Sequence, residues 1–166
     1  MVNNVEKCID DELPFEIPDS WEWVRLGNMI QLLSGQDMEP DKYSNRDDGI
    51  PYITGASNIK DGEIIINRWT HYPKTIASRG DLLLTCKGTV GAMAFLRVEK
   101  AHIARQIMAI KVENILCSNY AKYYIETYVT ALKAAAKSMI PGISRDNILL
   151  MLFPLPPLAE QNRIAK

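Results

Sequence analysis

The chain has 166 residues, 47% hydrophobic and 23% charged, which is the composition of a single globular domain and excludes an intrinsically disordered protein. No run of about eighteen apolar residues occurs, and the N-terminus lacks the basic and apolar regions of a secretory signal. We therefore expect a cytoplasmic protein with no membrane partner. Cys8, Cys86 and Cys117 form no C-x-x-C pair, which argues against a disulfide framework and a structural zinc site.

The formal net charge of −1 is unevenly distributed along the chain. Residues 1–78 contain 7 Lys or Arg and 14 Asp or Glu, whereas residues 79–166 contain 12 and 6. This asymmetry is compatible with a basic face for phosphate and an acidic face elsewhere. Folding mixes the two halves in space, so the asymmetry alone does not establish a nucleic-acid partner.

The first part of the chain predicts a lead-in segment, an apolar stretch and a long loop. Residues 1–17 are acidic and form the lead-in, which we expect to meet the core near Trp21 and Trp23. Residues 24–33 are mostly apolar. Residues 34–49 are rich in glycine, proline, asparagine and aspartate, which is typical of a loop.

Five segments then have the β-branched, aromatic or apolar composition of strands. They are residues 50–54, 63–69, 81–86, 92–98 and 103–112. Asp61 and Gly62 predict a tight turn between the first two. The third and fourth flank a glycine-containing loop and predict a hairpin. In the last, we expect Ile107, Met108 and Ala109 to pack inward.

Residues 119–137 predict the longest helix, because apolar side chains recur along it every three or four residues. These side chains are Tyr120, Tyr124, Tyr128, Leu132 and Ala135. Ser118 or Asn119 can cap the helix N-terminus. Lys133 and Lys137 suit the negative C-terminal end of the helix dipole.

The end of the chain predicts two further helices around a proline-rich connector. Ser144 can cap a short helix that runs through Leu150. Residues 153–158 contain three prolines, which predicts an extended connector and excludes a central strand. Residues 159–166 again have helical composition. Strands followed by helices indicate an α+β domain.

The motifs of DNA-modifying enzymes are absent from the sequence. No Asp or Glu stands two residues before a Lys, as in common restriction nucleases, and no Asn-Pro or Asp-Pro dipeptide could begin a methyltransferase loop. Lys87-Gly88-Thr89 lacks the upstream glycine of a nucleotide-binding loop. Neither His71 nor His102 has a partner serine or cysteine in a nucleophile motif such as G-x-S-x-G. We therefore expect a non-catalytic protein without a cofactor or a metal.

Four segments together resemble the specificity subunits of Type I restriction-modification systems. The first is residues 18–27, PDSWEWVRLG, in which Ser20 replaces the usual glycine. The second is residues 49–53, GIPYI, followed by Asn58, Ile59 and Gly62. The third is residues 80–85, GDLLLT, followed by Gly88 and Gly91. The fourth is Gly142-Ile143-Ser144 with residues 153–164, FPLPPLAEQNRI.

The resemblance implies a DNA target-recognition domain with a curved, mainly antiparallel β-sheet and packed helices. It places this domain at residues 18–157 and the start of a long conserved spacer helix at residues 158–166. Such subunits read one half of a split site in double-stranded DNA with each recognition domain, and they hold methyltransferase and restriction subunits. This sequence stops early in the spacer helix, so we expect either a shortened chain or a half-length subunit. A second recognition domain, or a homodimer through the spacer helix, would supply the other half.

Base readout needs forked donors and acceptors on exposed loops, and phosphate contacts need cations and hydroxyls. Residues 54–60 form the best candidate recognition loop, because they are polar, contain glycine and follow a strand. Arg105 and Gln106 interrupt an otherwise apolar strand. The candidate DNA-binding residues are Gln36, Thr54, Ser57, Asn58, Lys60, Lys87, Thr89, Arg105, Gln106, Lys137, Ser138 and Arg145.

Each candidate also has a purely structural interpretation. Arg105 can pair with an acidic residue on a neighbouring strand. Lys137 and Arg145 can be solvated surface charges, and Gln36 and Asn58 can satisfy turn geometry. Two other functions also remain open: the specificity domain of a fused restriction-methylation enzyme, and a protein-interaction module without DNA readout. A steep dependence of binding on salt would separate DNA binding from protein binding.

Overall fold

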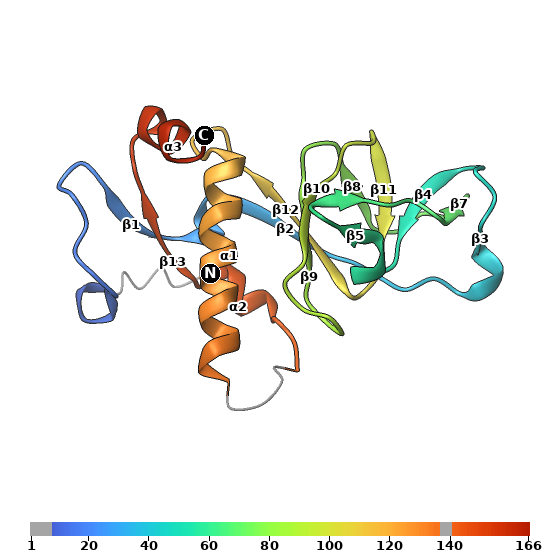
Figure 1. Ribbon diagram of the computed structural model, residues 1–166, viewed down its shortest axis with the longest axis horizontal. Helices are drawn as coiled ribbons and strands as arrows, with labels where there is room; N and C mark the ends of the chain where they lie inside the picture. The colour runs from blue at the N-terminus through green and yellow to red at the C-terminus, as the bar shows by residue number, and fades with distance from the viewer. Residues whose placement is uncertain (1–7, 137–140) are drawn as a thin grey trace, which may run out of the picture.

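The computed structural model describes residues 8–136 and 141–166. In this part of the chain the strands form a four-stranded sheet, a five-stranded sheet and two two-stranded sheets. The α+β class and the mainly antiparallel pairing are confirmed. Along the long axis of the molecule, Figure 1 shows the long helix α1 (Ser118–Ala135) and the terminal strands at one end and the five-stranded sheet at the other. None of the described helices has both the length and the apolarity of a membrane span.

The four-stranded sheet is antiparallel, in the order β10-β9-β12-β2. Its strands are β2 (Ile30–Ser34), β9 (Leu82–Thr85), β10 (Met93–Phe95) and β12 (Ile107–Val112). Successive residues of a strand point to opposite faces, so Leu84 joins the core beneath α1 while Leu83 joins the core shared with the five-stranded sheet. The predicted β9–β10 hairpin is confirmed, and Ile107, Met108 and Ala109 are buried as expected.

The five-stranded sheet has the order β3-β7-β4-β11-β8, with one parallel pair between β4 and β11. Its strands are β3 (Tyr43–Ser44), β4 (Ile50–Ile53), β7 (Trp69–Thr70), β8 (Ile76–Ser78) and β11 (Lys100–Ile103). The strand predicted at residues 50–54 is therefore confirmed as β4. The predicted long loop at residues 34–49 contains a 3₁₀ turn, η3 (Pro40–Lys42), and the short strand β3.

The strand predicted at residues 63–69 is wrong, although the turn before it is confirmed. Asp61 and Gly62 have φ angles of 51° and 75°, and they join β5 (Ile59–Lys60) to β6 (Glu63–Ile64) in a two-stranded hairpin. No regular strand continues from β6 to β7, and in between the buried Asn58 side chain donates to the Ile65 carbonyl.

The single strand predicted at residues 103–112 is also wrong, because the apolar run is divided between two sheets. β11 ends at Ile103 and pairs with β4 and β8, whereas β12 begins at Ile107 and pairs with β9 and β2. The turn between them closes with a hydrogen bond from the Ile107 N–H to the Ala104 carbonyl at 2.9 Å. Residues 104–106 therefore carry the chain from one large sheet to the other.

The predicted long helix is confirmed as α1, but its buried face is displaced. Its most buried residues are Tyr120, Ala121, Ile125 and Val129, while Tyr124 and Tyr128 lie half-buried at the edge. The predicted cap is wrong, since Cys117 occupies the N-cap position and no side chain caps the helix.

The C-terminal elements follow the prediction closely. Ser144 caps α2 (Arg145–Leu149) with a capping box completed by Asn147. The proline-rich segment is extended and contributes β13 (Leu152–Leu155), which among the described strands pairs with β1 (Glu22–Arg25) alone. The last helix is α3 (Leu158–Ile164). The remaining 3₁₀ turns are η1 (Asp10–Glu12), η2 (Leu26–Asn28) and η4 (Ala56–Asn58).

Candidate nucleic-acid interface

The crossover between β11 and β12 carries Arg105 and Gln106 at the molecular surface. Both side chains are exposed, whereas Ala104 before them and Ile107 after them are buried. Arg105 and Gln106 are polar within an apolar run because they lie in a turn that faces solvent. The crossover is where four other candidate segments meet.

The chain that follows β2 docks on this crossover through its backbone. Gly35 donates its N–H to the Ile107 carbonyl at 3.1 Å, and Gln36 donates to the Ile103 carbonyl at 3.0 Å. A Cβ atom at Gly35 would clash with the Ala104 carbonyl oxygen, so only glycine fits there. The exposed Gln36 is therefore held beside Arg105.

The β9–β10 loop and the segment that precedes α2 dock on the other side of the crossover. The Cys86 N–H donates to the Gln106 carbonyl at 2.8 Å, and the Cys86 carbonyl accepts from the Ile143 N–H at 2.8 Å. A Cβ at Gly142 would lie 2.8 Å from the Cys86 carbonyl oxygen. Figure 1 shows this loop and the start of α2 on the same side of the molecule.

These segments enclose a cleft of about 360 Å³. It is lined by Ser34, Gly35, Cys86, Lys87, Arg105, Met108, Ile143, Ser144 and Arg145. Lys87, Arg105 and Arg145 are exposed and make it cationic. Burial raises the pKa of the Cys86 thiol, which disfavours the thiolate that a cysteine nucleophile needs.

Arg145 is held against the end of β2. One guanidinium nitrogen, Nη1, donates to the Leu32 carbonyl at 3.1 Å and to the Ser34 hydroxyl at 2.8 Å. The arginine is exposed, so its other donors face the cleft or solvent. Two further candidates, Lys137 and Ser138, lie outside the described residues.

Arg105 is paired with Asp37, as its structural interpretation anticipated, although Asp37 lies in the loop after β2 and not on a strand. The Arg105 Nε lies 2.8 Å from Asp37 Oδ2, and the Arg105 backbone N–H donates to Asp37 Oδ1 at 3.1 Å. The two residues are far apart in the chain, so no motif or spacing could have identified Asp37.

Asn58 has the structural role that its turn-geometry interpretation anticipated, and its contact with DNA bases stays a prediction. Its side chain is fully buried, and Oδ1 accepts from both the N–H and the hydroxyl of Thr54 at 2.9 Å. Its Nδ2 donates to the Ile65 carbonyl at 2.8 Å and to Asn67 Oδ1 at 3.2 Å. Thr54, whose hydroxyl donates to Asn58, likewise serves the loop.

The same loop nevertheless borders the interface. Ser57 and Lys60 are exposed. Gly55 packs against the Gln106 side chain, whose Oε1 would clash with a Cβ at Gly55 and lies 3.6 Å from where a Gly88 Cβ would stand. Gln106 therefore lies between the two loops and links them.

The β9–β10 loop presents Lys87 and Thr89 to solvent on either side of Gly88, whose φ of 71° suits glycine. A residue that the sequence interpretation assigned only to the helix dipole also reaches this loop. The Lys133 Nζ lies 2.8 Å from where a Cβ of Gly91 would stand. Lys133 therefore adds a cation beside the loop.

His102 is a buried support that sequence reasoning missed. Its Nδ1 accepts from the backbone N–H groups of Lys74 and Thr75 at 3.2 and 3.1 Å, so the proton sits on Nε2, which donates to the Gln36 carbonyl at 2.8 Å. Burial is the main cause that lowers its pKa below 6.5. A neutral His102 therefore fixes the backbone that carries Gln36.

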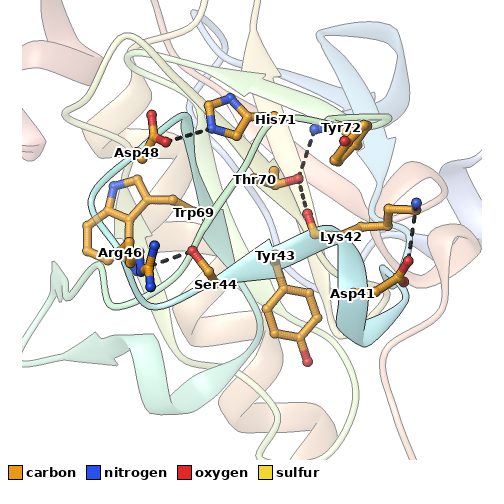
Figure 2. Close-up of a pocket in the computed structure, with 10 residues that line it drawn as sticks. All are labelled: Asp41, Lys42, Tyr43, Ser44, Arg46, Asp48, Trp69, Thr70, His71 and Tyr72. Atoms are coloured by element: carbon orange, nitrogen blue, oxygen red, sulfur yellow. Dashed lines mark hydrogen bonds and ion pairs between the residues drawn. The ribbon is translucent and has the colours of Figure 1, made fainter.

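A second hollow, of about 250 Å³, lies on β3 and β7 and contains none of the predicted site residues (Figure 2). Two aspartates balance its lysine and arginine: Lys42 lies 3.2 Å from Asp41, His71 lies 3.0 Å from Asp48, and Arg46 lines the same hollow. This balance makes it less suited to phosphate than the cationic cleft. Among the described residues, no cluster of three or more His, Cys, Asp or Glu side chains could hold a metal ion.

Comparison with known proteins gives relatives along almost the whole chain. The chain is 27% identical over 157 residues to a putative type I restriction enzyme MjaX specificity subunit of Methanocaldococcus jannaschii, and the match covers 91% of this chain and 36% of that protein. The chain thus spans about a third of the curated relatives' length.

Solved structures agree with the sequence match. The fold is similar to the HsdS subunit from Thermoanaerobacter tengcongensis, with a TM-score of 0.80, 26% identity, and coverage of 92% of this chain and 37% of that one. The fold is also similar to a chain from a structure that concerns complex assembly and conformational transition of the type I R-M system. The TM-score is 0.83 and the identity 26%, and the match covers 92% of this chain and 38% of that one. The family model for the Type I restriction modification DNA specificity domain matches residues 18–166. This chain therefore belongs to the Type I restriction-modification DNA specificity domain family.

Proposed function

We propose that this chain recognises one half of a split DNA target for a Type I restriction-modification complex and catalyses no reaction itself. The observation that carries the proposal is the convergence of four polar segments on the β11–β12 crossover. Together they present Lys87, Arg105, Gln106 and Arg145 on one exposed surface. Cations suit phosphate, while an arginine and a glutamine are the side chains that distinguish guanine and adenine.

The partners follow from the family. In this proposal residues 18–157 form the recognition domain and α3 begins the spacer helix. The family model spans both parts, and the curated relatives are about three times as long as this chain, which is compatible with further recognition and spacer segments in such subunits. The other half-site is read by a second recognition domain or by a second copy joined through the spacer. Methyltransferase subunits bind the resulting subunit and methylate the site that it selects, and restriction subunits join them. One of the similar solved structures concerns complex assembly of the type I R-M system, which supports such partners.

The test is to map methylated sites after co-expression of the full-length specificity subunit with its methyltransferase. A matched variant carries residues 18–157 of another family member in place of this domain. We expect a split motif in which only one half changes. A motif with both halves unchanged would contradict DNA recognition by this domain and favour a protein-interaction module.

A further inference from the structure

The loop that carries Asp37 is held rigidly from beneath. The Gln36 carbonyl accepts from His102, which is fully buried, and the Met38 N–H donates to the Tyr52 hydroxyl at 3.3 Å. The rings of Tyr52 and His102 pack with centroids 5.0 Å apart. The residues on both sides of Asp37 are thus anchored to the core of the five-stranded sheet, so the position of the carboxylate is fixed.

Asp37 in turn orients the Arg105 side chain. One carboxylate oxygen holds Nε, and the other accepts the backbone N–H of the same arginine. The guanidinium is therefore clamped along one edge. Its two terminal nitrogens, Nη1 and Nη2, have no hydrogen-bond partner among the described residues, and the side chain is 68% exposed.

This arrangement is poorly explained as a device for stability. An ion pair this exposed contributes roughly 0–1 kcal/mol, because water and salt screen it. It is also a poor phosphate site, since the Asp37 carboxylate beside the guanidinium repels an anion. A neutral ligand with two acceptors side by side is the better partner.

We propose that Arg105, buttressed by Asp37, is the guanine-reading residue of this domain. The O6 and N7 atoms of guanine present two acceptors in the major groove and no charge, and they match the free fork of an arginine. Asp37 is the positioning residue, and the cations Lys87 and Arg145 across the cleft hold the flanking phosphates. This inference rests on the proposed function and adds the identity of one base.

The test measures methylation by the assembled complex on duplexes that carry each base in turn at every position of the half-site. Arg105→Ala should lower the preference for guanine at one position by roughly 5- to 150-fold and leave the other positions unchanged. Asp37→Asn should weaken the preference at that same position, because Arg105 stays but is no longer held by a charge. Unfolding midpoints close to that of the unmodified protein would show that both variants fold.

The matched control is Arg97→Ala. Arg97 also makes an exposed ion pair, with its Nη2 2.6 Å from Glu63 Oε1, but it lies beyond the opposite end of β10 from the cleft. It should change no base preference. A half-site without guanine, or an equal loss of methylation on every duplex with Arg105→Ala, would overturn the inference. Failure of the proposed function would differ, since exchange of residues 18–157 would then leave both halves of the motif unchanged.

Discussion

At the scale of single residues, His102 is the hub that joins three backbone segments. It accepts two N–H groups from the loop before β8, donates to the Gln36 carbonyl, and sits in β11 next to the crossover. Its neutral tautomer satisfies every one of these contacts. Burial is the main reason that protonation is disfavoured, and a proton on Nδ1 would in addition face two N–H donors.

The low pKa of His102 predicts a stability that depends on pH. Because the unfolded chain binds a proton at about pH 6.5 and the folded chain only at a lower pH, stability is complete above 6.5 and falls as the pH drops from there through the folded pKa. The contribution is at most about 1.4 kcal/mol per pH unit. Urea unfolding between pH 7.5 and 5.5 should show this slope.

Substitution of His102 separates its two roles. His102→Asn retains an acceptor near Nδ1 and loses the donor to Gln36, and it should cost about 1–3 kcal/mol at pH 7.5 because the partly buried Gln36 carbonyl loses its partner and the smaller side chain leaves space in the core. It should also remove the His102 share of the pH slope. His71→Gln, at the exposed second histidine, is the control. A slope that is identical in the unmodified protein and in His102→Asn would refute the argument.

Residue types and their order predicted which segments meet at the candidate site better than they predicted which side chains are exposed there. Arg105 and Gln106 were identified because polar residues interrupt an apolar run, and a surface turn is the physical reason. Asn58 is equally polar but buried. The backbone of a turn can satisfy the hydrogen bonds of an asparagine amide as well as a DNA base can, so polarity alone does not separate the two roles. Asp37 and His102 carried no signal, because their partners lie in loops that are distant in the sequence.

At the scale of elements, Gln161 connects α1, the proline-rich connector and α3. Its Oε1 accepts from the Cys117 N–H at 2.8 Å, which serves the start of α1 in place of a capping side chain. Its Nε2 donates to the carbonyls of Pro156 at 2.9 Å and Ile115 at 3.1 Å. One buried amide therefore ties α3 to the start of α1 and to the connector.

Gln161→Leu should destabilise the folded chain by about 1–3 kcal/mol, because it leaves a buried N–H and two carbonyls without partners. The measurement is the urea midpoint, with Asn162→Ala, at the next and exposed position of α3, as the control. Gln161→Glu tests the chemistry further, since a carboxylate can still accept from Cys117 but would face two carbonyls. Equal midpoints for Gln161→Leu and Asn162→Ala would exclude this role.

The elements themselves were predictable wherever one segment packs against one neighbour. The β9–β10 hairpin and α2 depend on local turn and cap chemistry, which the sequence displays directly. The run from Ile103 to Val112 packs against more than one neighbour, because its two ends belong to different sheets. Apolar residues stand on both sides of the crossover, so the sequence gives no sign of where one strand ends and the next begins. The buried stripe of α1 is displaced for a related reason: Tyr124 and Tyr128 lie half-buried at the edge of the core, while Ile125 and Val129 fill it.

At the scale of the whole molecule, the uneven charge of the sequence is partly preserved in space. Four of the cations at or beside the cleft, Lys87, Arg105, Lys133 and Arg145, come from residues 79–166, the half with excess positive charge. The acidic half contributes Asp37, which forms an ion pair with Arg105. A net charge of −1 is therefore compatible with a local cationic surface.

This surface predicts how binding of DNA by the assembled complex responds to salt. Each phosphate that a lysine neutralises releases a counterion, so the slope of log affinity against log salt should fall by about 1 in magnitude in Lys87→Gln. Lys100→Gln, at the opposite end of β11 from the crossover, should leave the slope unchanged. The loss in Lys87→Gln should be the same on cognate and altered half-sites, because a phosphate contact carries no base preference. A change in base preference with an unchanged slope would instead place Lys87 against a base, and Arg105 would then share its role as a reader.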